Sequence, residues 1–165
     1  DFKGQKIVTK VQPNILFIMV DDHAANAISA YGLKINTTPN IDRIGKEGIR
    51  LDHCYVTNSI CTPSRAAILT GTYNHVNRVT TLKTHLDNNL PNVAKHLNVG
   101  GYQTAVIGKW HLGEGHDHQP TGFDFRSVLP GQGDYFDPEM IEMGKCATET
   151  DYLTDIITEK SQKWL

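Results

Sequence analysis

The fold class is indicated by one stretch near the start of the chain, Pro13-Asn14-Ile15-Leu16-Phe17-Ile18-Met19-Val20-Asp21-Asp22. Residues 15–20 are continuously apolar and partly β-branched, which is typical of a strand that is covered on both faces, as in a parallel sheet. The run therefore predicts a strand over residues 14–20. In open α/β sheets, ligands gather beyond the carboxyl ends of the strands, and Asp21 and Asp22 lie at that position.

The adjacent carboxylates of Asp21 and Asp22 repel each other unless a positive group separates them. A hard divalent cation with oxygen ligands does this, so the pair is a predicted metal site. The alternative is structural, because Asp also serves in turns and as a helix cap.

Further along the chain, predicted strands and helices alternate, which favours an α/β layered sheet with flanking helices. The expected segments are a strand at 14–20, a helix near 40–47, a strand at 49–56, helices at 62–70 and near 91–98, a strand at 103–107, and a final helix within Thr150–Leu165.

A second informative run is Cys61-Thr62-Pro63-Ser64-Arg65-Ala66-Ala67-Ile68-Leu69-Thr70-Gly71. Pro63 suits a first helical turn and Gly71 suits a helix stop, so the run predicts a short helix that begins near Cys61. Arg65 lies four residues after Cys61, and both side chains can therefore project from one helix face. A cysteine at a helix N-terminus beside a guanidinium sits in a positive field, which suits an anionic substrate. The alternative is an ordinary buried cysteine.

A third run follows the last predicted strand, Gly101-Tyr102-Gln103-Thr104-Ala105-Val106-Ile107-Gly108-Lys109-Trp110-His111-Leu112-Gly113. Lys109 and His111 are two residues apart, so in extended chain they face one way while Trp110 faces the other. An ammonium and an imidazole that converge on one point suit a sulfate oxygen or an alkoxide. The alternative is a surface lysine and a structural histidine around a packed tryptophan.

Taken in order, the three runs resemble the signature motifs of type I sulfatases. The resemblance implies an alkaline-phosphatase-like α/β fold and a sulfuric ester hydrolase. It implies that Cys61 is oxidised to formylglycine by a formylglycine-generating or anaerobic maturation enzyme. It also implies a divalent cation, usually Ca²⁺ in that family, held by Asp21, Asp22 and residue 61.

The same resemblance implies that Arg65, Lys109 and His111 act on the sulfate group beside residue 61. The segments Thr121–Asp124 and Leu129–Tyr135 resemble a branch of sulfatases that acts on sulfated amino sugars such as N-acetylglucosamine 6-sulfate. The expected partner is therefore a sulfated carbohydrate or another sulfate ester. The resemblance implies an exported protein (periplasmic, secreted or lysosomal), and we expect no signal peptide within these residues.

Two other functions remain open from the sequence. A phosphonate or phosphodiester hydrolase of the same superfamily could share the formylglycine and the metal. A non-catalytic protein with an unmodified Cys61 would keep only a metal and anion site.

Composition limits the remaining classes. The chain has 165 residues with a net charge of −2, which indicates about one domain and no basic stripe for nucleic acid. The longest apolar run is too short to span a bilayer, so no transmembrane segment is expected. Cys54 and Cys146 could pair, but Cys54 is expected as a buried free thiol in the strand at 49–56.

We expect residues 1–165 to be the N-terminal part of a sulfatase catalytic domain, and the fold to be incomplete. Within it, residues 112–147 are rich in glycine, proline and carboxylates and are expected to form a long loop that walls the active site. The resemblance also implies a second pair of metal ligands and an acid for the leaving group, and no candidate for either follows His111 in suitable context. This chain alone is therefore expected to be inactive.

Overall fold

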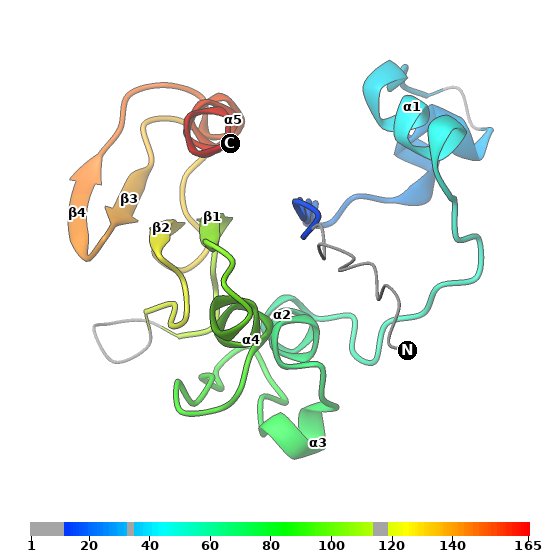
Figure 1. Ribbon diagram of the computed structural model, residues 1–165. Helices are drawn as coiled ribbons and strands as arrows, with labels where there is room; N and C mark the ends of the chain where they lie inside the picture. The colour runs from blue at the N-terminus through cyan, green and yellow to red at the C-terminus, as the bar shows by residue number, and fades with distance from the viewer. Residues whose placement is uncertain (1–11, 33–34, 114–118) are drawn as a thin grey trace, which may run out of the picture. The chain divides into compact units, whose positions relative to one another are not determined.

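The computed structural model describes residues 12–32, 35–113 and 119–165 of the chain (Figure 1). These residues divide into two compact units, one that ends at Asp52 and one that begins at His53.

The first unit contains two 3₁₀ turns, η1 (Ala25–Ala27) and η2 (Ser29–Tyr31), and the helix α1 (Pro39–Glu47). The helix near 40–47 is thus confirmed, with a proline in its first turn. The Asp42 carboxylate accepts hydrogen bonds from the hydroxyls of Ser29 and Thr38, at 2.6 and 2.8 Å. These bonds lower the pKa of Asp42 and join η2 to the start of α1.

The strands that the sequence predicts at 14–20 and 49–56 are wrong. Both segments lie among the described residues, and neither forms a strand there. Phe17 and Ile18 are each 68% exposed. A strand exists only where a neighbouring strand takes up its backbone hydrogen bonds, and apolar sequence alone does not supply that neighbour.

The second unit is built on a four-stranded sheet in the order β1-β2-β3-β4. The strands are β1 (Ala105–Lys109), β2 (Phe125–Leu129), β3 (Glu139–Glu142) and β4 (Lys145–Thr148). β1 and β2 are parallel, whereas β2–β3 and β3–β4 are antiparallel. The strand predicted at 103–107 is confirmed as β1, which begins and ends two residues later.

The interpretation of residues 112–147 as one long loop is wrong, because three strands begin within this segment (residues 114–118 lie outside the described part). Met143 and Gly144 have φ values of +48° and +86° and connect β3 to β4 as a two-residue hairpin. These strands were not predicted because they contain polar residues, which a half-exposed sheet tolerates on its solvent-facing side.

Four helices complete the second unit: α2 (Cys61–Thr70), α3 (Asn74–Asn77), α4 (Val93–Val99) and α5 (Leu153–Trp164). The three longer ones confirm the predicted helices. In Figure 1, α5 lies on the other side of β1 from α2 and α4, so helices flank the sheet. The buried core contains Ala66 of α2, Val128 of β2, and Val79, Leu86, Trp110 and Leu112 from the connections between elements, and the partly buried Val106 of β1 packs against it.

All three cysteines are free thiols, so Cys54 and Cys146 do not pair. Cys54 is exposed, and its predicted burial in a strand is wrong for the reason given above. A hydrogen bond with Glu139 raises the pKa of the exposed Cys146 thiol. Among the described residues, every helix is too short or too polar to cross a membrane.

Candidate active site

Cys61 is the first residue of α2, and its side chain is partly exposed. In the first hydrogen bond of the helix, the Ser64 amide donates to the Ile60 carbonyl at 2.9 Å. It ends at Gly71, whose φ of +65° confirms the predicted stop. The residue before the helix is Ile60, which contributes no side-chain cap, so the N-terminal amides and the helix dipole make this end of α2 electropositive.

Lys109 brings a second positive group to Cys61. It is the last residue of β1, at the carboxyl end of the strand, and its Nζ lies 3.7 Å from Cys61 Sγ. The two residues are 48 apart in sequence, so only the tertiary fold of the second unit makes them neighbours. An anion at residue 61 would therefore face the ammonium and the helix N-terminus together.

Arg65 joins the same two segments. Its Nη1 donates a hydrogen bond to the carbonyl oxygen of Lys109 at 2.7 Å. The guanidinium thus holds the end of β1 against α2 one turn after Cys61. This contact gives Arg65 a structural role that the sequence did not indicate.

The two residues after Lys109 differ in burial, because Trp110 is buried in the core and His111 is half-buried. Trp110 is 6% exposed and meets Phe123 edge-to-face, with ring centroids 6.4 Å apart. The packing role predicted for Trp110 is confirmed. His111 has a φ of +54°, which is left-handed rather than extended. The sequence prediction assumed an extended chain from Lys109 to His111. This assumption is wrong, because β1 ends at Lys109.

Asp21 and Asp22 belong to the first unit, where both are exposed. They follow an extended segment rather than a paired strand, and Asp22 has a φ of +50°, so the backbone turns at the pair. Two adjacent carboxylates offer hard oxygen donors, the type that calcium prefers. The chemistry of this donor set fits the predicted cation.

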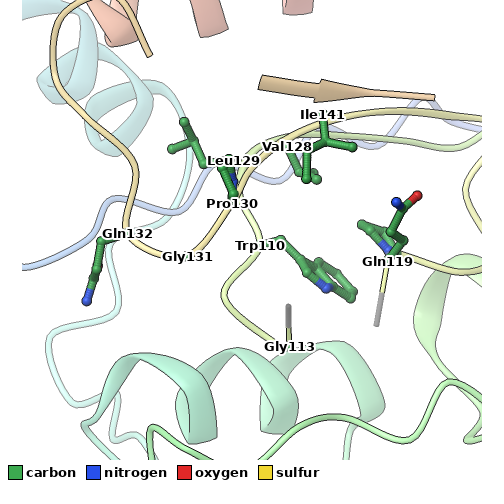
Figure 2. Close-up of a pocket in the computed structure, with 10 residues that line it drawn as sticks. Trp110, Gly113, Gln119, Val128, Leu129, Pro130, Gly131, Gln132 and Ile141 are labelled. Atoms are coloured by element: carbon green, nitrogen blue, oxygen red, sulfur yellow. The ribbon is translucent and has the colours of Figure 1, made fainter. Parts of the chain in front are cut away.

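A cavity of about 360 Å³ lies beside Trp110 in the second unit (Figure 2). Trp110 forms part of its wall, together with residues from β2, β3 and the loop after β2, namely Val128, Leu129, Pro130, Gly131, Gln132 and Ile141. Gln132 also contacts Lys109, since its Oε1 accepts a hydrogen bond from Lys109 Nζ at 2.5 Å. Gln132 is absent from the predicted site residues. A polar residue between two glycines, directly after a strand, is the signal that could have found it.

The sequence matches the sulfatase family over residues 13–165. The chain belongs to the sulfatase family. It is 48% identical, over 98% of its length, to an N-acetylglucosamine-6-O-sulfatase of Bacteroides thetaiotaomicron. Among solved structures, BT4656 in complex with its substrate D-glucosamine-2-N,6-O-disulfate is also 48% identical and superposes with a TM-score of 0.87 over 92% of the chain.

This sulfatase chain spans 28% of the length of that curated relative and 31% of that solved chain. It therefore adopts part of the alkaline-phosphatase-like α/β fold, as the sequence predicted. A more distant likeness extends to a phosphonate monoester hydrolase of Agrobacterium radiobacter, at 26% identity and a TM-score of 0.59 over 72% of the chain and 26% of that structure.

Proposed function

We propose that the full-length protein is a sulfuric ester hydrolase that removes the 6-O-sulfate of N-acetylglucosamine or a related sulfated amino sugar. The observation that carries this proposal is the 3.7 Å approach of Lys109 Nζ to Cys61 Sγ at the N-terminus of α2. This arrangement attracts a compact oxyanion. The amino-sugar class is carried over from the relative that is 48% identical over nearly the whole chain.

Residue 61 is the proposed nucleophile, with Sγ standing where the formylglycine oxygen would be. When a maturation enzyme has converted Cys61, the hydrated aldehyde supplies a hydroxyl that attacks sulfur. Lys109 and Arg65 offset the negative charge that accumulates on the sulfate oxygens as the alcohol leaves. His111 is the proposed proton acceptor at residue 61. We further propose that the protein is exported, as family members are.

Asp21, Asp22 and residue 61 are proposed to hold one Ca²⁺. The cation would supply Lewis-acid polarisation of a sulfate oxygen. Calorimetry on the full-length protein should give Ca²⁺ binding that Asp21→Ala or Asp22→Ala weakens strongly. Tight binding that survives both substitutions would place the metal elsewhere.

The reaction class is tested with three matched esters of one aryl alcohol: a sulfate, a phosphate and a phosphonate. We expect the matured protein to hydrolyse the sulfate fastest, and Cys61→Ala to abolish turnover. Peptide mass spectrometry checks that residue 61 carries an aldehyde. An unmodified thiol after expression with a competent maturation enzyme would favour the non-catalytic alternative.

A phosphonate or phosphodiester hydrolase is the second candidate, and the likeness to the phosphonate monoester hydrolase favours it. Faster turnover of the phosphonate than of the sulfate would select it. If aryl sulfate reacts but N-acetylglucosamine 6-sulfate does not, the reaction class stands and the amino-sugar assignment falls.

The 165-residue chain by itself is proposed to have little activity. Asp21, Asp22 and residue 61 supply few ligands, whereas calcium takes roughly six to eight oxygens. The check is an assay of the aldehyde-bearing 165-residue chain beside the full-length protein. Comparable turnover would contradict the proposal.

A further inference from the structure

The loop after β2 returns to the end of β1 and delivers Gln132 to Lys109. The two strands are parallel, and their last residues, Lys109 and Leu129, are partners in the register. Gln132 follows three residues after Leu129, and its Oε1 accepts the hydrogen bond from Lys109 Nζ. In Figure 2, the Gln132 side chain points away from Trp110 rather than across the cavity.

The shape of this loop is set by the two glycines that flank Gln132. Gly131 and Gly133 have φ values of +56° and +73°, in the left-handed region that disfavours other residues. A Cβ on Gly133 would lie 2.7 Å from Cδ2 of Leu129, so the loop backbone is packed directly on the end of β2. Leu129 is itself buried. The position of Gln132 is therefore fixed by backbone geometry and packing, although its side chain is exposed.

A lysine side chain needs a hydrogen-bond partner to hold its ammonium group in one position. The ammonium is a compact charge with three donors on a flexible four-carbon stem, and it does not orient itself. One contact to Gln132 Oε1 and one to residue 61 fix where the charge lies. A neutral carbonyl fixes the ammonium and leaves its charge available, whereas a carboxylate at the same place would fix it and cancel that charge.

We propose that Gln132 is a positioning residue that aims the Lys109 ammonium at the group on residue 61 without itself adding a negative charge beside it. The inference rests on the proposed function, because it assumes that Lys109 stabilises charge on an oxyanion. It predicts that Gln132 affects turnover through Lys109. It also predicts that turnover depends both on the hydrogen-bond acceptor of Gln132 and on the absence of charge on its side chain.

The first test is a double-mutant cycle on the full-length, matured protein with an aryl sulfate. Gln132→Met keeps the length of the side chain and removes the carbonyl, and we expect kcat to fall about tenfold with KM changed less than twofold, within the range of a lost charged contact. In a Lys109→Ala background, the same change should have no further effect. Gln103→Met is the matched control, an exposed glutamine at the start of the predicted third motif that should leave kcat unchanged.

The second test is Gln132→Glu, which keeps the acceptor but adds a negative charge. We expect kcat/KM to fall further than in Gln132→Met at neutral pH. The ratio of variant to parent activity should rise as the pH falls toward the carboxyl pKa, because protonation restores a neutral group. A purely structural role of Gln132 would give no such pH dependence, and melting temperatures should match the parent in all Gln132 variants.

The outcomes separate the two proposals. If the parent hydrolyses aryl sulfate and Gln132→Met is as active as the parent, or if its effect persists without Lys109, the positioning role is wrong. If the parent prefers the phosphonate ester, the sulfatase proposal falls and the same cycle is measured on that ester. If the parent hydrolyses neither, calorimetry with inorganic sulfate replaces kinetics, and equal affinity in parent and Gln132→Met overturns the inference.

Discussion

Lys109 is half-buried and lies outside the buried hydrophobic core, so its loss should affect chemistry more than folding. We expect Lys109→Ala to lower turnover of an aryl sulfate by about a hundredfold or more, because a preorganised charge is lost where negative charge develops. The free energy of unfolding should change by about 0.5 kcal/mol or less. Steady-state kinetics and urea unfolding measure the two effects.

Lys83→Ala is the control for this lysine, since Lys83 is exposed and lies outside the proposed site. Turnover that is equal in Lys109→Ala, Lys83→Ala and the parent would remove Lys109 from the sulfate site.

Trp110, the next residue, should show the opposite behaviour. It is almost fully buried among Ala66, Leu112 and Val128 and packs against Phe123. Trp110→Ala leaves a cavity in this core and should lower the free energy of unfolding by about 3–5 kcal/mol. Trp110→Phe, which refills part of the volume, should lose clearly less in the same urea titration. Equal unfolding midpoints for both variants and the parent would contradict the packing role.

The contact between β1 and α5 depends on one glycine. Gly108 has a φ of +103°, and a Cβ there would lie 3.1 Å from Cδ1 of Ile157 on α5. Gly108→Ala should therefore destabilise through backbone strain of about 1–3 kcal/mol and through crowding of the helix. Gly101→Ala is the matched control, because Gly101 has a φ of +84° with no atom within 4 Å of the added Cβ.

The melting temperature of Gly108→Ala should be lower than that of Gly101→Ala. In an Ile157→Ala background, Gly108→Ala should cost less stability, because the smaller side chain makes room for the added Cβ. An equal loss in both glycine variants would mean that strain alone operates and that α5 does not press on β1.

A partly exposed ion network joins α5 to the sheet. Lys160 Nζ lies 2.5 Å from Glu142 on β3 and 2.8 Å from Glu149. The hydrogen bond from Lys160 lowers the pKa of Glu142. Partial burial opposes the charge of Lys160, but its contacts with the two carboxylates raise the pKa of Lys160 overall. Both groups are therefore stabilised in their charged forms by folding.

The pH dependence follows from these directions. The Glu142 contribution is present above its unfolded pKa, about 4.3, and is lost as the pH falls through its lower folded value. The Lys160 contribution is present below its unfolded pKa, about 10.4, and is lost as the pH rises through its higher folded value. Lys160→Met should thus cost about 1 kcal/mol near pH 7 and progressively less at both extremes.

Urea unfolding at a series of pH values measures this loss. Lys163→Met is the control, because the Lys163–Glu159 pair is exposed and lies within α5 itself. A loss for Lys160→Met that is constant from acid to alkaline pH would exclude the ionic network as its cause.

Large apolar side chains near the start of the chain are left in contact with solvent. Ile15, Phe17 and Ile18 are each more than 60% exposed, in a continuous run. Exposed apolar surface of this kind marks a contact site or promotes association. The 165-residue chain on its own should therefore bind the dye ANS and self-associate in ultracentrifugation, and Phe17→Ser with Ile18→Ser should reduce both. A monomeric chain that leaves ANS fluorescence unchanged would contradict this expectation.

Local patterns predicted the helices well and the strands poorly. Helix α2 has its proline in the first turn and its glycine at the end, and these signals act within a few residues of the chain. The strand at 14–20 failed although its sequence is strongly apolar, and β4 formed although it includes Lys145 and Thr148. A helix closes its hydrogen bonds internally, whereas a strand depends on a neighbour that local sequence does not name.

The sequence by itself predicted which residues make up the site: a pair of aspartates, a cysteine in a proline- and arginine-bearing helix start, and a lysine after a strand, in the order found in sulfatases. Only the tertiary structure decided the distances among them within the second unit. It set Lys109 beside Cys61, used Arg65 to hold the end of β1, turned His111 out of the extended conformation, and brought Gln132 back to Lys109. The physical reason is that motifs record which chemistry a chain carries, whereas contacts between residues far apart in sequence arise only when strands pair and helices pack.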